Sequence, residues 1–144
     1  MRDIVLYVGD FGLPDRTASA LRALGNASVL RAAGYRVVIA GKFQQVPEPQ
    51  AQPLQVQGFD CHDIRQPLPG LARVDYTMSP ANIRALALHI GAERIAAIMA
   101  YNYPGFGLHR LLRLGMELGI PVINESTEWY GWEGVRPITN VRRI

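Results

Sequence analysis

Three glycine-rich or polar segments of this 144-residue chain carry residue types that could bind or transform a ligand. They are Gly9-Asp10-Phe11-Gly12, Tyr101-Asn102-Tyr103 and the segment 125–133. Each of them follows an apolar run of strand length. In open parallel sheets ligands bind beyond the carboxyl ends of the strands, where the strand order reverses. We therefore expect the three segments to converge at one edge of a sheet.

Segment 125–133 has the most unusual composition. It contains three carboxylates, both tryptophans and a tyrosine within nine residues. Glu125 comes directly after a predicted buried strand, and an isolated buried carboxylate is costly, so it needs a partner or a place in a cleft. A carboxylate in a cleft can position a hydroxyl or act as a base. We take Glu125 and Glu128 as candidate catalytic residues and Trp129 as a candidate binding residue. The alternative is a domain-junction loop whose tryptophans pack on a neighbouring element.

The corner formed by Tyr101, Asn102 and Tyr103 places two aromatic rings and an amide at the end of a strand. Sugars are commonly bound by aromatic stacking on their C–H faces and by amide hydrogen bonds to their hydroxyls. The corner is therefore a candidate sugar-binding element. The alternative is that one tyrosine packs beneath the loop.

Gly9, Asp10 and Gly12 form the third candidate binding element. Glycines allow the backbone to pass close to a ligand, and the amides at the start of a following helix favour anions. The segment does not follow the G-x-G-x-x-G pattern, and no acidic residue ends the next strand, so we expect no dinucleotide cofactor. The alternative is a tight strand-to-helix turn.

Charge and cysteine content narrow the class of protein. The 15 basic residues exceed the 12 acidic ones by only three and are scattered, whereas nucleic-acid binding proteins concentrate basic charge on one face. We expect no nucleic acid partner, although weak peripheral contact with an anionic membrane is compatible with this charge. Cys61 is the only cysteine, which excludes a cysteine-based zinc cluster and favours a reducing, cytoplasmic location. The three histidines are widely spaced and predict no metal site.

The apolar periodicity predicts an α/β fold. A helix is expected to begin near Asp15 or Thr17 and to stop at Gly34, a second to run from Ser79-Pro80 to Gly91, and a third to end at Gly119. Apolar runs predict strands at 4–8, 36–40, 60–64, 95–100 and 120–123, with a short further strand near 54–56. We interpret this order as a single doubly wound parallel sheet with strand order 3-2-1-4-5, in a domain spanning 1–134, followed by a linker or helix at 135–144.

These motifs, in this order, resemble the N-terminal Rossmann-like domain of GT-B type glycosyltransferases, especially family 4. The resemblance is carried by the segments 22–27, 30–37, 100–105 and 121–130. It covers most of the chain outside 43–79. In that family the N-terminal domain mainly holds the acceptor, the C-terminal domain holds the nucleotide-sugar, and transfer occurs in the cleft between them.

The resemblance implies a role for each candidate element. Gly9 and Gly12 would lie near the donor diphosphate, residues 101–103 would line the acceptor side, and residues 125–129 would face the reacting sugar. Many relatives carry a histidine shortly after the fifth strand that contacts the donor sugar, whereas this chain has Thr127-Glu128 there. The partners implied are a nucleotide-sugar donor and a sugar, lipid-linked or small-molecule acceptor.

A complete enzyme of this type needs a second Rossmann-like domain. We therefore expect the chain to be a truncated piece or a separately encoded domain that folds alone but does not catalyse alone. Its docking face should be an exposed apolar patch near Trp129 and Trp132, which can also promote homodimers. Two alternatives remain: a non-catalytic, flavodoxin-like module that binds a nucleotide or anion, and an interaction subunit of a split enzyme.

Overall fold

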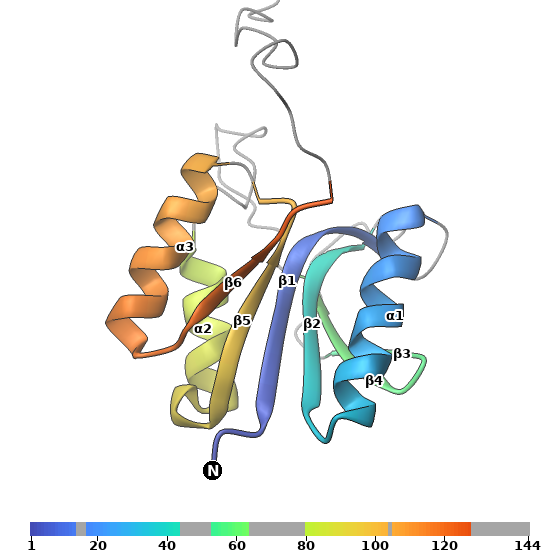
Figure 1. The fold of residues 1–144 in the computed structure, drawn as a ribbon, viewed down its shortest axis with the longest axis horizontal. Helices are drawn as coiled ribbons and strands as arrows, with labels where there is room; N and C mark the ends of the chain where they lie inside the picture. Colours follow the sequence, from blue (N-terminus) through green and yellow to red (C-terminus); the bar gives the residue numbers. More distant parts are fainter. Residues whose placement is uncertain (14–16, 44–52, 64–79, 104, 128–144) are drawn as a thin grey trace, which may run out of the picture.

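The computed structural model of the chain describes residues 1–13, 17–43, 53–63, 80–103 and 105–127. These residues form one sheet with helices on both of its faces (Figure 1). The strands are β1 (Ile4–Leu13), β2 (Arg36–Phe43), β3 (Leu54–Val56), β4 (Phe59–Asp63), β5 (Ile95–Tyr101) and β6 (Val122–Glu125). The helices are α1 (Ala18–Ala32), α2 (Ala81–Ile90), α3 (Gly105–Leu118) and the short 3-10 helix η2 (Ala92–Arg94). The predicted domain boundary at 134 and the segment 135–144 lie outside the described residues.

The sheet has the order β3-β4-β2-β1-β5-β6, which differs from the prediction of five parallel strands. The difference lies at the edge, where β3 pairs antiparallel with β4 and makes the sheet mixed. Gln57 and Gly58, between these two strands, both have positive φ angles, and such residues allow a two-residue hairpin. The remaining pairs, β4–β2, β2–β1, β1–β5 and β5–β6, are all parallel.

Three strands are longer than the apolar runs predicted, and one of them, β2, continues to Phe43 instead of ending at Ala40. β1 continues to Leu13 instead of ending in a loop at Gly9, with an irregular register between Val8 and Gly12. Phe11 and Leu13 are fully buried, so alternate side chains continue to enter the core beyond Gly9. β5 includes Tyr101, which the sequence had placed in the following loop.

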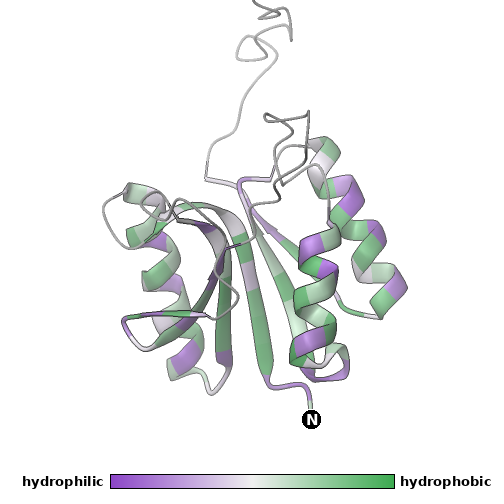
Figure 2. Cartoon of the chain, turned by 180° about the vertical axis from the view of Figure 1, so that it is seen from behind, coloured by the Kyte–Doolittle hydropathy of each residue, from purple (hydrophilic) through white to green (hydrophobic). Residues whose placement is uncertain are grey.

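Each face of the sheet has its own core. On one face α1 covers the inward side chains of β1, β2 and β4 with Ala20, Ala23, Leu24 and Ala27. On the other face α2 and α3 pack on β1, β2 and β5 through Ile83, Leu86, Leu111 and Leu114. Figure 2 shows the central strands as mainly hydrophobic and the helices as mixed in character, as expected for strands covered on both faces.

Helix ends follow the predicted signals. The Thr17 side chain accepts a hydrogen bond from the Ala20 amide at the start of α1, as an N-cap does. Gly34, Gly91 and Gly119, after the three helices, all have positive φ angles that favour glycine. The polypeptide therefore turns back into the next strand at the glycines expected from the sequence.

Gly115 and Gly25 provide a matched test of this packing, since both lie inside helices. A Cβ atom at Gly115 would stand 2.5 Å from Val122 Cγ2 and 2.7 Å from the Ile120 carbonyl oxygen, whereas one at Gly25 would meet nothing within 4 Å. We expect Gly115→Ala to lower the free energy of unfolding by about 1–3 kcal/mol through overpacking. Gly25→Ala should raise it by roughly 0.5–1 kcal/mol, because alanine loses less backbone entropy. Urea unfolding of both variants measures the two effects, and equal effects would contradict the described approach of α3 to β6.

Candidate functional site

The register of the parallel strands aligns the three candidate segments at one edge of the sheet. Gly9 of β1 is opposite Tyr101 of β5, and Tyr101 is opposite Glu125 of β6. The three residues therefore form a row across neighbouring strands, at the last residues of β5 and β6 and within β1, which continues to Leu13. The candidate site depends on this alignment, because ligands of open parallel sheets bind beyond the carboxyl ends of the strands.

Gly9 is a packing glycine in this arrangement. A Cβ atom there would lie 2.9 Å from the Phe11 ring and 2.9 Å from the Tyr101 Cβ atom. A Cβ atom at Gly41 would lie 2.8 Å from the same Phe11 ring. The two glycines thus make room for a buried phenylalanine, and the predicted open glycine loop is replaced by a continuing strand. Gly12 also lies within β1 and is partly buried.

The two tyrosines of the predicted sugar-binding corner point into the two cores. Tyr101 is 7% exposed and its ring centroid lies 5.4 Å from that of Phe11, while Tyr103 is 8% exposed in the core beneath α2 and α3. The sequence alternative that a tyrosine packs beneath the loop therefore describes both of them. Their rings do not form an exposed stacking surface.

Asn102 is the exposed member of the corner. It adopts a left-handed conformation with φ of 47°. Its side chain accepts a hydrogen bond from the Thr127 amide at 2.9 Å and donates one to Thr127 Oγ1 at 2.7 Å. The Asn102 amide therefore ties the turn after β5 to the segment after β6, and it shapes the edge of the sheet.

Glu125 is the centre of a polar cluster on the α1 face. Its carboxylate accepts a hydrogen bond from the Tyr7 hydroxyl, another from Asn26 Nδ2 at 2.9 Å, and an ion-paired one from Arg22 Nε at 3.2 Å. The Asn26 amide also lies 3.3 Å from the Tyr7 hydroxyl. The side chain of Glu125 is 18% exposed and that of Arg22 is 55% exposed. We call these four residues the Glu125 cluster.

The Glu125 cluster satisfies the requirement that the sequence raised for a carboxylate at the end of a strand. Arg22 and Asn26 are four residues apart on α1, so they project from one side of the helix. Tyr7 projects from the middle of β1 and its hydroxyl reaches Glu125 past β5. Burial raises the pKa of Tyr7 above its ordinary value, and the hydrogen bond to the Glu125 carboxylate raises it further.

The sequence alone missed Tyr7, Arg22 and Asn26 as members of the site. Tyr7 was the single polar group within an apolar run, and Asn26 lies between the buried residues Ala23 and Ala27. Those positions were the available signals, but their common partner lies about a hundred residues away. Of the predicted site residues, Glu128 and Trp129 lie outside the described residues, as does the side chain of Asp10.

Metal-binding groups, membrane-spanning helices and similar proteins would each give a further indication of function. The described residues hold no group of three or more His, Cys, Asp or Glu side chains that could bind a metal ion. None of the helices in the described ranges is long and apolar enough to cross a membrane. Comparisons with protein-family models, curated proteins and solved structures found no match to the chain.

The raised pKa of Tyr7 makes the stability of the fold sensitive to alkaline pH. Above the ordinary value of 10.0 the unfolded chain releases the Tyr7 proton while the folded chain retains it. The unfolded state then binds fewer protons, so the free energy of unfolding should fall as pH rises, with Tyr7 contributing up to about 1.4 kcal/mol per pH unit. Urea unfolding at a series of pH values from about 8 to about 11 measures this slope.

Two conservative variants assign the slope to Tyr7. Tyr7→Phe removes the titrating hydroxyl and should flatten the alkaline part of the profile. Tyr35→Phe removes the hydroxyl of an exposed tyrosine and leaves Tyr7 in place, so the slope should persist. An unchanged slope in Tyr7→Phe would contradict the buried hydrogen bond to Glu125.

Proposed function

We propose that the chain is the acceptor-side, Rossmann-like half of a GT-B type glycosyltransferase, which transfers a sugar from a nucleotide-sugar to an acceptor. In this proposal a second domain or chain binds the nucleotide-sugar. The described chain binds the acceptor at the carboxyl edge of β1, β5 and β6. The observation that carries the proposal is the Glu125 cluster, which fixes a partly exposed carboxylate at that edge.

The hydrogen bonds of the cluster leave capacity for a sugar. Within the described residues, one carboxylate oxygen of Glu125 accepts hydrogen bonds from Asn26 and Arg22, and the other oxygen accepts one from the Tyr7 hydroxyl. A carboxylate offers about four acceptor positions, so about one remains, on the oxygen bonded to Tyr7. Arg22 uses only Nε in these contacts, which leaves the terminal nitrogens of a half-exposed guanidinium as donors. A neighbouring acceptor and donor suit the adjacent hydroxyl groups of a sugar ring.

The rigidity of the cluster favours a positioning role. Tyr7 is fully buried and Asn26 is partly buried, so the carboxylate is held from strand and helix together. Groups held this way bind substrate without the entropic cost of ordering a mobile side chain. We assign Glu125 to hold the acceptor hydroxyl and Arg22 to donate to an adjacent oxygen of the same sugar.

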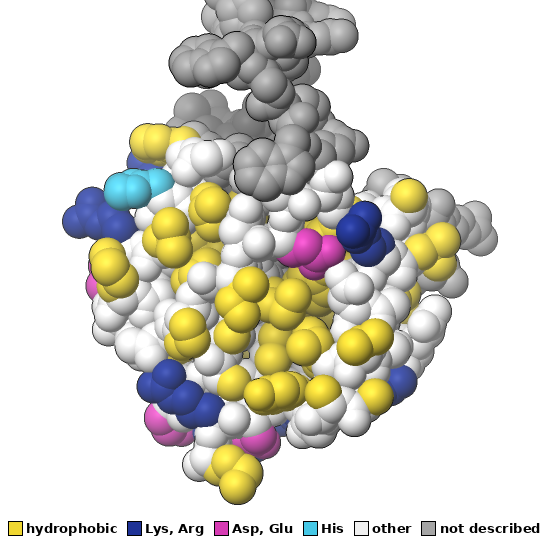
Figure 3. All heavy atoms as spheres, in the orientation of Figure 1, with side chains coloured by type: hydrophobic (Ala, Val, Ile, Leu, Met, Phe, Trp, Pro, Cys, Tyr) yellow, Lys and Arg dark blue, Asp and Glu magenta, His cyan; other side chains and the backbone are white. Residues whose placement is uncertain are grey.

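An exposed apolar area of the sheet beside the Glu125 cluster supports the proposal that a second domain or chain packs there. α1 covers the β1 and β2 part of this face, whereas Ile123 of β6 is 51% exposed. Figure 3 shows hydrophobic side chains gathered at the centre of this face, next to a carboxylate and a cation. An exposed apolar area rimmed by polar groups is typical of a surface that another domain or protein covers.

Binding of sugars by the chain tests this proposal. We would record amide NMR spectra of the 144-residue chain with a panel of mono- and disaccharides, and separately with UDP and GDP. At least one sugar should shift the amides of Arg22, Glu125 and Thr127 saturably, and the nucleotides should bind more weakly. Arg22→Gln should weaken sugar binding about tenfold, the loss expected for one hydrogen bond to a charged group.

Arg94→Gln is the matched control for this experiment. Arg94 is also a half-exposed arginine, and it forms an ion pair with Asp3. It lies directly before the first residue of β5, at the opposite end of that strand from the carboxyl edge. The control should leave sugar affinity unchanged. Tight nucleotide binding with no sugar binding would instead favour the nucleotide-binding module, and sustained sugar transfer by this chain alone would overturn its role as half of a site.

A further inference from the structure

The outer edge of β6 is unpaired in the described part of the chain. β6 is the last strand in the sheet order, and among the described strands it pairs only with β5. The carbonyl groups of Pro121 and Glu125 accept hydrogen bonds from amides of β5 and of the turn after it. Because backbone groups alternate in direction along a strand, the amide and carbonyl groups of Val122 and Asn124 point away from β5. Such an edge is a template for a further strand.

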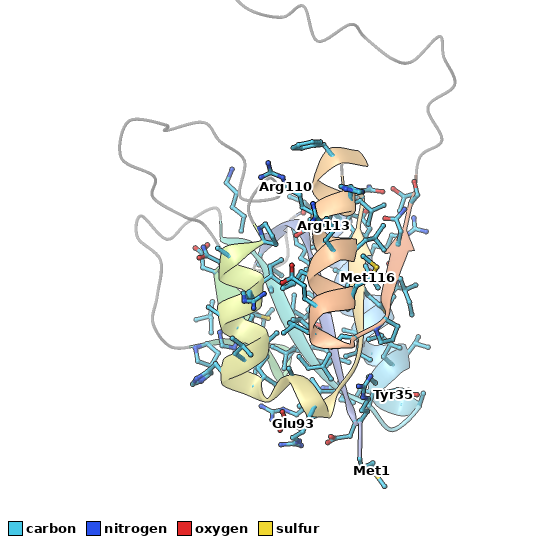
Figure 4. The ribbon with its side chains drawn as sticks, turned by 90° about the vertical axis from the view of Figure 1, so that its left-hand side faces the viewer. Met1, Tyr35, Glu93, Arg110, Arg113 and Met116 are labelled. Atoms are coloured by element: carbon cyan, nitrogen blue, oxygen red, sulfur yellow. The ribbon has the colours of Figure 1, made fainter. Side chains whose placement is uncertain are left out.

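α3 presents apolar side chains beside this edge. The helix packs closely on β6, since a Cβ atom at Gly115 would stand 2.5 Å from Val122 Cγ2. Leu112 and Met116 lie four residues apart on the helix and are 42% and 75% exposed. Figure 4 shows Met116 on the flank of α3 toward β6, whereas Arg110 lies toward α2. The edge strand and the neighbouring helix therefore expose apolar surface together.

The residues of this edge carry none of the charges that commonly protect a strand edge from pairing. Such edges are often protected by charged side chains, especially lysine, or by proline. Val122, Ile123 and Asn124 are uncharged, and Ile123 is 51% exposed. Pro121 lacks an amide hydrogen, but its backbone faces β5 and leaves the outer edge open. The composition of β6 thus favours pairing with another strand.

Antiparallel pairing of two β6 strands matches the direction of these backbone groups. A two-fold axis at Ile123 places Val122 of each copy opposite Asn124 of the other. These are the residues whose backbone groups point outward, so each such pair can exchange two hydrogen bonds. Ile123 then lies opposite the same residue of the second copy as a non-hydrogen-bonded pair, in which the side chains are close. The edge is therefore complementary to itself, as the interface of a two-fold dimer must be.

The charges near the two ends of β6 are complementary in the same arrangement. Arg2 lies at the amino end, where its Nη1 atom donates a hydrogen bond of 2.8 Å to the Gly119 carbonyl oxygen. Glu125 is the last residue of the strand. Antiparallel pairing brings the amino end of each strand toward the carboxyl end of the other, so each exposed Arg2 approaches the end that carries the second copy's carboxylate. Opposite charges then face each other, which favours this partner and this orientation.

We infer that β6 and α3 form the interface of a homodimer, in which the β6 strands of two copies pair antiparallel about Ile123. The two sheets become one continuous sheet, and the α3 helices lie side by side on one of its faces with Leu112 and Met116 between them. The inference goes beyond the sugar-transfer proposal and does not depend on it. The interface leaves α1 and the Arg22 side of the Glu125 cluster uncovered, and it borders the apolar area of the other face only at Ile123.

A disulfide cross-link tests the contact between the two copies of residue 123. Ile123→Cys should form a covalent dimer on mild oxidation, because Cα atoms about 4.5 Å apart in a non-hydrogen-bonded pair lie within disulfide range. The native Cys61 is buried and should not react. Leu88→Cys is the matched control, since Leu88 is 56% exposed on α2. Non-reducing electrophoresis should show about tenfold more cross-linked dimer for Ile123→Cys than for the control.

Sedimentation equilibrium of charged variants tests the two-fold register. Ile123→Lys and Ile123→Glu each place like charges opposite each other, so each should raise the dimer dissociation constant at least about tenfold. An equal mixture of the two variants pairs a lysine with a glutamate and should restore the dimer. Leu88→Lys adds the same charge at an equally exposed site and should leave the dimer intact. Circular dichroism of each variant checks that the fold is retained.

The same measurements can overturn the inference. A chain that stays monomeric up to high micromolar concentration would show that the edge does not pair with a second copy. A dimer that resists both Ile123→Lys and Ile123→Glu would place the contact on another face, such as the apolar area beside α1. Equal cross-linking of Ile123→Cys and Leu88→Cys would show that random collision, and not pairing about residue 123, forms the disulfide.

Discussion

The hydrogen bond from the buried Tyr7 hydroxyl to the Glu125 carboxylate organises the carboxyl edge of this protein. Removing a phenol and a carboxylate from water costs free energy unless the two groups form a hydrogen bond with each other. Here the two groups join β1 to β6 past the intervening β5, and Asn26 and Arg22 add α1 to the same cluster. The cluster thus connects β6 to β1 and α1, whose residues lie about a hundred positions earlier in the sequence.

The packing around Tyr7 explains two glycines of the sheet, Gly9 and Gly41. The Tyr7 ring packs edge-on against Phe11, with the two ring centroids 5.2 Å apart, and the Phe11 ring in turn contacts Tyr101. Gly9 and Gly41 lack side chains where the Phe11 ring lies. The aromatic contacts bury the tyrosine rings, so the polar chemistry of this edge shifts from the rings to Glu125 and Arg22.

The sequence predicted those parts of the fold that depend on local patterns. Helices α1, α2 and α3 followed from apolar spacing and from glycines with positive φ angles, both of which are properties of neighbouring residues. The extension of β1 was missed because Gly9-Asp10 was interpreted as a turn, although Phe11 and Leu13 continue the alternation of buried side chains. The antiparallel β3 was expected only as a short strand, without its pairing, because pairing is set by contacts beyond the local sequence.

The sequence predicted where the candidate site lies better than it predicted which side chains form it. Strand order placed residues 9, 101 and 125 at one edge, which the register confirms. Which side chains can contact a ligand there depends on burial, and the rings of Tyr101 and Tyr103 are buried. The donors to Glu125 could not be identified from spacing, because Tyr7 is 118 residues away in sequence.

A double-mutant cycle between Tyr7→Phe and Glu125→Gln tests the central interaction most directly. Unfolding free energies of the unmodified chain, both single variants and the double variant yield the coupling energy between the two side chains. A hydrogen bond to a charged group predicts a coupling of about 1.5–3 kcal/mol. Effects that add to within about 0.5 kcal/mol would show that the two side chains act independently, and would contradict the organisation of the edge around their hydrogen bond.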